Sequence, residues 1–292
     1  MREVLRAATI RLAATSDTPR LDAELLMAHT LSCTRSDLLL HRQRDPAPDS
    51  FNALVERRTA HEPVAYITGE AEFYGRTFRV TPATLIPRAD SETLIRAALE
   101  LAPKTMRVLD LGTGTGALLL TVLAETGAKG VGVDASNAAC EVAEENARRL
   151  GLAASAEILH RSWDEPGWQE GLGTFDLILC NPPYVEDAAE LASEVRDYEP
   201  AAALFAGPDG LSAYRCLIPQ LSALLNPNAC AILEIGHTQA QPVTSLAERA
   251  GFAVEMHRDL AGRPRALALS RSRQRSNTAQ AEERACKELA SR

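Results

Sequence analysis

Apolar residues in the first quarter of the chain recur with the period of α-helices. They follow this spacing at residues 4–12 and again at residues 21–31. Thr18 followed by Pro19 is typical of a helix start, because threonine can cap a helix and proline is tolerated at the first helical position. A proline-containing break then precedes another amphipathic stretch at residues 51–58. The pattern predicts a small helical bundle.

The pattern changes after residue 105, where short β-rich runs alternate with helical segments. This alternation is typical of a parallel sheet covered by helices. We therefore expect an α/β fold of Rossmann-like type, with residues 266–269 as a last strand at an edge of the sheet. The other predicted strands occupy residues 107–111, 130–133, 157–159, 175–180, 230–235 and 252–255.

A β-hairpin is predicted between these two parts. Aromatic-containing stretches flank Gly75 and Arg76, which suits a two-residue turn with glycine first. Ser91 stands where it can cap the helix that follows. The predicted organisation is a helical bundle at 1–71, a hairpin connector at 72–84, an α/β domain at 85–270, and a polar tail, mobile or loosely helical, at 271–292.

The composition narrows the class of protein. Hydrophobic residues make up 46% and charged residues 24% of the chain, as in soluble proteins with a sizeable core. No apolar run reaches the roughly 18 residues of a membrane span, and residues 1–15 lack the apolar block and cleavage site that a secretory signal is expected to have. Six cysteines without a CxxC pair indicate neither a zinc site nor a disulfide framework. A net charge of −8 argues against a nucleic-acid partner. We expect a cytoplasmic protein without membrane, metal or direct nucleic-acid contacts.

A glycine-rich turn follows the first predicted strand of the α/β domain. Residues 110–116 read Asp-Leu-Gly-Thr-Gly-Thr-Gly and precede a helical run. Glycines let the backbone turn sharply and approach a ligand closely. The next strand ends in Asp134, where a carboxylate in such folds accepts ribose hydroxyl protons. Together these features predict a cofactor that carries adenosine, although the turn alone also fits a looser dinucleotide-binding pattern.

The segment Asn181-Pro182-Pro183-Tyr184 follows the fourth predicted strand. Ligand crevices of open α/β sheets lie at the carboxyl ends of strands, so we expect this segment beside the glycine turn. Asn181 Oδ1 and the Pro182 carbonyl can each accept one N–H bond from an NH₂ group, which turns the electron density of a planar nitrogen toward a methyl donor. Two prolines withhold competing donors, and Tyr184 offers a flat face for a planar substrate. The segment predicts methyl transfer to an amide or amine nitrogen.

With both motifs in place, the sequence resembles the PrmC/HemK family. These protein-(glutamine-N5) methyltransferases modify the glutamine of the GGQ motif in class I peptide chain release factors. The resemblance covers about residues 1–269. Besides the glycine turn and the Asn-Pro-Pro-Tyr segment, it is carried by Glu-Pro-Val-Ala-Tyr-Ile-Thr-Gly at 62–69, Leu-Ile-Pro-Arg at 85–88, Tyr-Glu-Pro at 198–200 and Leu-Glu-Ile-Gly at 233–236.

The resemblance implies a class I methyltransferase domain that uses S-adenosyl-L-methionine, with the N-terminal bundle as a candidate for recognising the release factor. We expect a monomer. Asn181, Pro182 and Tyr184 would be catalytic, and with Pro183 they would hold the substrate glutamine. The cofactor would contact Gly112, Thr113, Gly114, Thr115, Gly116, Asp134, Trp163 and Asn181, with the Trp163 ring beside the adenine.

The sequence departs from the family pattern at residues 87–92 and, only lightly, at residues 259–265, and three rival interpretations are open. The family often reads Pro-Arg-Pro-Glu/Asp-Thr-Glu where residues 87–92 read Pro-Arg-Ala-Asp-Ser-Glu, so Ala89 puts the rigidity of this loop in question. Asn-Pro-Pro-Tyr also occurs in adenine-N6 methyltransferases of nucleic acids, and the looser glycine pattern suits a nicotinamide-dependent oxidoreductase. A binding module without catalysis would not require both motifs. The acidic charge and the N-terminal motifs favour the glutamine methyltransferase.

Overall fold

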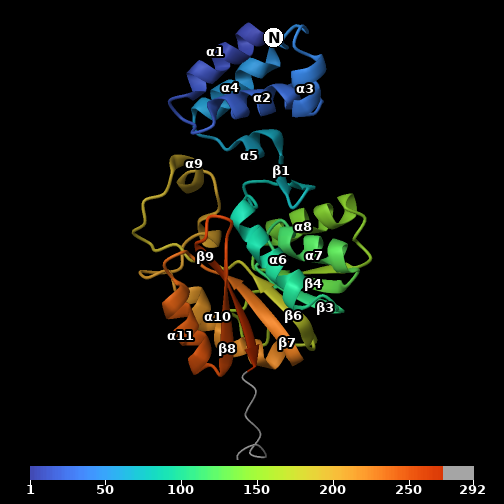
Figure 1. Ribbon diagram of the computed structural model, residues 1–292, viewed down its shortest axis with the longest axis vertical. Coiled ribbons are helices and arrows are strands. Elements are labelled where there is room, and N and C mark those ends of the chain that lie inside the picture. The colour runs from blue at the N-terminus through green and yellow to red at the C-terminus, as the bar shows by residue number, and fades with distance from the viewer. Residues whose placement is uncertain (272–292) are drawn as a thin grey trace, which may run out of the picture.

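The chain folds into a helical bundle and an α/β body (Figure 1). The computed structural model describes residues 1–271, so the tail predicted at 271–292 lies, beyond Arg271, outside the described residues. Leu12, Leu26 and Phe51 pack in the apolar core of the bundle and are at most 1% exposed. The bundle comprises α1 (Arg2–Leu12), α2 (Pro19–Thr30), α3 (Arg35–His41), α4 (Ser50–Thr59) and α5 (Val64–Thr68).

A buried ion pair crosses the bundle. Arg58 Nε lies 2.7 Å from Asp22 Oδ2, and both side chains are under 8% exposed. Thr18 stands before Pro19 at the predicted capping position, but its side chain does not cap α2. The Thr18 hydroxyl instead donates to Asp22 Oδ1 at 3.0 Å. The Thr18 hydroxyl, which the sequence predicted as the cap of α2, therefore serves as a hydrogen-bond donor to the buried Asp22 carboxylate.

The connector between the parts is a short hairpin of β1 (Glu70–Phe73) and β2 (Arg76–Arg79). Its two turn residues are Tyr74 and Gly75, with φ of 51° and 71°. The prediction that glycine comes first was therefore wrong, because Tyr74 takes the first position of the turn. The Tyr74 side chain packs against the core of the α/β body, and its backbone N–H donates to Glu92 Oε1 at 3.2 Å. These contacts hold a tyrosine in a backbone conformation that usually favours glycine.

The α/β body is built on a seven-stranded sheet with strand order β5-β4-β3-β6-β7-β9-β8. The first five strands in this order are parallel, and β9 pairs antiparallel with β7 and β8. The prediction of an edge strand at residues 266–269 was wrong, because β9 is internal and these four residues are buried. The strands are β3 (Arg107–Leu111), β4 (Lys129–Asp134), β5 (Ala156–His160), β6 (Phe175–Cys180), β7 (Leu225–Glu234), β8 (Phe252–Arg258) and β9 (Pro264–Arg271).

Helices cover both faces of this sheet (Figure 1). In β6, Leu177 and Leu179 pack against the helices of one face, and Ile178 and Cys180 against those of the other. This alternation confirms the predicted parallel sheet with two covered faces. The first face carries α6 (Glu92–Leu101), α7 (Ala117–Thr126) and α8 (Asn137–Arg149), and the second carries α10 (Ser212–Leu224) and α11 (Ala240–Arg249).

Residues 185–206, which we call the bridging segment, connect the two parts of the molecule a second time. The segment leaves the end of β6, contains α9 (Ser193–Arg196), and closes on itself where Ala206 N donates to Val185 O at 2.8 Å. Glu194 of α9 lies 2.8 Å from the buried Arg58 of the bundle. The Tyr198 hydroxyl donates to the Ala60 carbonyl, also at 2.8 Å.

Candidate active site

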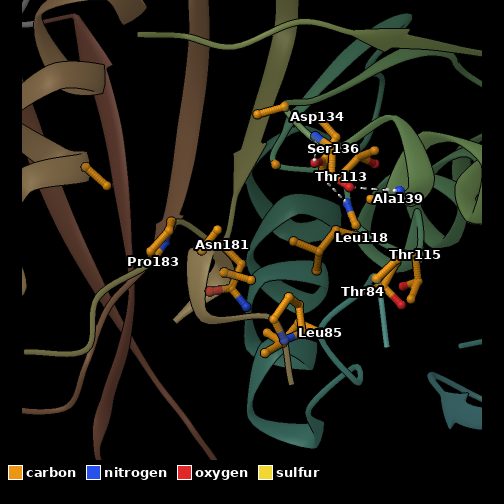
Figure 2. A pocket seen from close by; sticks show the side chains of 18 of the residues that line it. Thr84, Leu85, Thr113, Thr115, Leu118, Asp134, Ser136, Ala139, Asn181 and Pro183 are labelled. Carbon is orange, nitrogen blue, oxygen red and sulfur yellow. Dashed lines mark hydrogen bonds between the residues drawn. The ribbon is translucent and has the colours of Figure 1, made fainter. Parts of the chain in front are cut away.

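A cavity of about 580 Å³ opens at the carboxyl ends of the parallel strands. The glycine turn after β3, Asp134 at the end of β4 and Asn181 after β6 all line it. Figure 2 shows Asn181 and Pro183 on one side of this cavity and Asp134, Ser136 and Thr113 on the other, with Leu118 between them. The two motifs that are far apart in the sequence thus share one space.

The glycine turn is shaped by backbone conformations that side chains disfavour. Gly112 has φ of 72°, and a Cβ there would lie 3.3 Å from the ring of Trp163. Gly116 has φ of 78°, and a Cβ there would lie 2.9 Å from Leu120 Cδ1. The backbone N–H groups of residues 112 and 113 both donate to Val133 O, at 2.8 and 3.0 Å. Glycine at these positions therefore lets the turn pack against α7 while its backbone lines the cavity.

Asp134 is held rigidly at the rim of the turn. Its Oδ2 accepts the Gly114 N–H at 2.8 Å, and its Oδ1 accepts the Ser136 N–H at 2.9 Å. A carboxylate has about four lone-pair sites, so each oxygen keeps the capacity to accept a further hydrogen bond. The Asp134 carboxylate is therefore oriented and still able to bind hydroxyl groups of a ligand.

Asp110 lies beneath the same turn and is 1% exposed. Burial raises the pKa of its carboxyl to about 7, and the negative charge of Asp134 adds to the shift, while a hydrogen bond from Thr113 opposes it. The Thr113 hydroxyl donates to Asp110 Oδ2 at 2.7 Å. This contact fixes the middle of the turn from below.

The Asn-Pro-Pro-Tyr segment divides between the cavity and the core. Asn181 and Pro183 line the cavity. Pro182 is buried, and Tyr184 packs against the core of the second sheet face, so its ring is not part of the lining. The Tyr184 hydroxyl lies 3.3 Å from Glu234 Oε1, and burial raises its pKa well above the ordinary value. The structure thus places Tyr184 as a support behind the segment rather than on the cavity wall.

Two polar residues near Asn181 were missed by the sequence reasoning as site residues. Ser91 occupies the predicted capping position of α6, but its hydroxyl makes no cap and instead accepts a 3.5 Å contact from Asn181 Nδ2. Glu234, at the end of β7, is 1% exposed. Burial raises its pKa to about 7, against the lowering effects of Ser91, Arg265 and Tyr184. The signal available in the sequence was a glutamate directly after the apolar run at 229–233.

The loop at 85–88 forms another wall of the cavity. Ile86 N donates to Glu199 Oε2 at 3.2 Å, and Arg88 forms an ion pair with Glu199. Glu199 belongs to the bridging segment and is buried. After Arg88 the chain enters the short 3₁₀ helix η1 (Ala89–Ser91). The contacts with Glu199 hold the loop that lacks the family's proline at position 89.

The structure also bears on membrane and metal binding. Within residues 1–271, no helix is long and apolar enough to cross a membrane. The same residues contain no group of three or more histidine, cysteine or acidic side chains arranged to hold a metal ion.

Comparison with known proteins gives matches along most of the chain. The family described as PrmC N-terminal domain matches residues 3–69, and the family described as methyltransferase domain matches residues 103–251. The release factor glutamine methyltransferase of Cereibacter sphaeroides is 44% identical over 272 residues, which cover 90% of this chain and 95% of that protein. The protein of the same name from Moorella thermoacetica is 42% identical, covering 86% of this chain and 90% of its own length.

Solved structures resemble the fold more distantly. The hMettl16 catalytic domain in complex with a MAT2A 3′UTR hairpin has a TM-score of 0.56 at 15% identity, covering 77% of this chain and 82% of that chain. A methyltransferase from Pyrococcus furiosus has a TM-score of 0.51 at 17% identity, covering 76% and 98%. At these identities the likeness concerns the fold alone.

Proposed function

This chain belongs to the family of release factor glutamine methyltransferases, and on that premise we propose that it methylates the side-chain amide nitrogen of the GGQ glutamine in class I peptide chain release factors. The methyl donor is S-adenosyl-L-methionine. The observation that carries the proposal is the shared cavity, in which Asn181 faces the glycine turn at the ends of adjacent strands β6 and β3. Such a partner, engaged in translation termination, implies a cytoplasmic location.

The residues around the glycine turn fit an adenosine-bearing cofactor. The spare lone pairs of Asp134 accept the ribose hydroxyls, and residues 112–115 border the rest of the ligand, whereas Gly116 lies outside the cavity lining. Trp163 lines the same cavity against Gly112, where its ring can pack beside the adenine. When bound, the sulfonium of the cofactor supplies an already activated methyl group.

The chain's own contribution to the reaction is placement of the amide nitrogen. Asn181 Oδ1 and the Pro182 carbonyl accept the two N–H bonds of the glutamine NH₂ group, which directs its π electron density toward the methyl group. A C–N bond forms as the C–S bond breaks, and the methylated amide then releases one proton to water. Alignment of two bound reactants can lower the barrier by as much as ~7 to 11 kcal/mol, so no general base is required.

The N-terminal bundle is proposed to recognise the release factor. It stands at the end of the α/β body where the bridging segment borders the cavity (Figure 1). We also propose that the protein acts as a monomer.

The test is a methylation assay with methyl-labelled S-adenosyl-L-methionine. We expect label in a class I release factor, located on the GGQ glutamine by peptide mass spectrometry, and no label when that glutamine is replaced by alanine. Duplex and single-stranded nucleic acids serve as parallel substrates. Label in nucleic acid but not in the release factor would overturn the proposal in favour of an adenine methyltransferase.

A further inference from the structure

The two ends of the Asn181 amide have opposite effects on an NH₂ substrate. Oδ1 accepts hydrogen bonds and helps to hold the substrate, whereas Nδ2 donates them and would oppose it. In the structure Nδ2 lies 3.5 Å from the Ser91 hydroxyl oxygen, so this end of the amide is directed at Ser91. Oδ1 therefore points away from Ser91. At 3.5 Å this contact is long for a hydrogen bond. The orientation of the Asn181 amide therefore also depends on the groups that surround Ser91.

Glu234 lies behind Ser91 at the end of β7. The Ser91 hydroxyl lies near enough to the Glu234 carboxyl to lower its pKa, although no hydrogen bond between the two is formed in the structure. Glu234 Oε2 is buried and has no hydrogen-bond partner among the described residues, so it is free to accept the Ser91 proton. Ser91 itself is 4% exposed, so little solvent competes for its hydroxyl. A serine hydroxyl has one proton, and it donates that proton to a carboxylate in preference to an amide oxygen.

Groups from several elements set the charge around Glu234. The Tyr184 hydroxyl donates to Glu234 Oε1 at 3.3 Å, and Arg265 of β9 pairs with Asp90 of η1 at 2.8 Å. Among residues 1–271 no cation lies within ion-pair distance of Glu234, and the charge of Arg265 acts on its carboxyl from farther away. The titratable and charged groups that face it are Asp90, Cys180, Tyr184, Tyr214 and Arg265.

We propose that Ser91 and Glu234 are positioning residues that fix the Asn181 amide with Oδ1 toward the substrate. The ionised Glu234 carboxylate only accepts hydrogen bonds, so Ser91 donates its proton to Glu234. The Ser91 oxygen is then left as an acceptor, and it takes a hydrogen bond from Asn181 Nδ2. Oδ1 remains for the glutamine N–H. This inference deepens the proposed function and rests on it.

The proposed hydrogen bonds from Ser91 to Glu234 and from Asn181 to Ser91 predict a pH dependence of turnover. When Glu234 is protonated it can donate to Ser91, and the Ser91 proton can then turn toward Asn181 Oδ1 and favour the opposite orientation of the amide. Turnover at saturating cofactor should therefore fall as the pH drops through about 7. Asp110 titrates in the same range but lies under the cofactor turn, so its effect is measured separately as cofactor affinity.

The matched pair Ser91→Val and Ser91→Thr tests the role of the hydroxyl, because the two variants have the same shape and differ in one O–H group. We expect Ser91→Val to lose about tenfold in kcat, the equivalent of one hydrogen bond, with cofactor affinity retained. Ser91→Thr should keep most of the turnover and the fall below pH 7. Glu234→Gln should remove that pH-dependent fall. Equal kcat in the Val and Thr variants, or an unchanged pH profile in Glu234→Gln, would overturn the proposal.

A second measurement separates this inference from the proposed function. In protein labelled with ¹⁵N-asparagine, the Asn181 side-chain NH₂ signal is assigned by its loss in Asn181→Ala. We expect slow hydrogen exchange of this NH₂ in wild type and Ser91→Thr, and fast exchange in Ser91→Val. Slow exchange without release factor methylation would reject the proposed function and retain the orientation of Asn181. Equally fast exchange in all three proteins would reject the orientation, whatever the substrate.

Discussion

Replacement of Asn181 by alanine tests the proposed chemistry most directly. Asn181 lines the cavity, and its one described side-chain hydrogen bond is the 3.5 Å contact with Ser91. Truncation therefore removes little that stabilises the fold, and Pro182 and Pro183 still restrict the backbone. What is lost is one preorganised acceptor for the reacting amide. By analogy with the loss of one oxyanion-hole donor, we expect a rise in the barrier of ~2.7 to 4 kcal/mol, which is about 10² to 10³ in kcat.

The assay measures methyl transfer to a release factor under saturating cofactor, with cofactor affinity taken from calorimetry. Affinity should fall by about tenfold at most, because the glycine turn and Asp134 are untouched. Asn137→Ala is a matched control, since the exposed Asn137 side chain contacts Glu141 at 2.9 Å and does not line the cavity. If Asn181→Ala turns over at a rate close to that of Asn137→Ala, the assigned role of Asn181 is refuted.

Three further variants test the packing of the glycine turn and the effects of two buried carboxylates on stability. Gly116→Ala forces a side chain into φ of 78° against Leu120, so we expect a loss of stability of ~1 to 3 kcal/mol in denaturant unfolding, and an unchanged midpoint would contradict the packing. Arg58→Ala leaves Asp22 buried without its partner, for an expected loss of ~3 to 5 kcal/mol, whereas a loss under about 1 kcal/mol would show that the pair is dispensable. Burial raises the pKa of Asp110 in the folded state from 3.8 to about 7, so between these pH values the folded state binds one proton more than the unfolded state. The contribution of Asp110 to the free energy of unfolding therefore falls as the pH rises from 3.8 to about 7, and it stays low at higher pH. Asp110→Asn should therefore gain more in melting temperature at pH 8 than at pH 5, and equal changes at both would refute the shift.

The sequence predicted the elements better than it predicted their contacts. The apolar runs confirmed as β3 and β6 are buried on both faces, which leaves a strong local signal. The internal position of β9 was missed, because strand order depends on pairing with β7, which is distant in sequence. In β8, Phe252 is buried and Val254 half-buried, whereas four of the other five residues are exposed, and this exposure suits the edge that the strand occupies.

The candidate site shows the same division. The glycine turn and Asn181 are read from local sequence, and their meeting follows from the rule that ligands bind at the carboxyl ends of parallel strands. The environment of Ser91 does not follow from such a rule. Its hydroxyl suits a helix cap in isolation, and only the folded chain brings it to Asn181 and Glu234. The roles of these residues in catalysis remain predictions.

The bridging segment has a consequence for dissecting the protein. It is anchored to the bundle through Arg58 and Ala60, and to the loop at 85–88 through Glu199. Removal of the first 69 residues would thus remove the residues that Glu194 and Tyr198 contact. The bridging segment, which forms one wall of the cavity, would then lose its attachment at that end. A fragment without the bundle is accordingly expected to be less active than the whole enzyme, even toward short peptides that do not contact the helices of the bundle. Docking and catalysis are better separated by point changes on the outer surface of the bundle than by truncation.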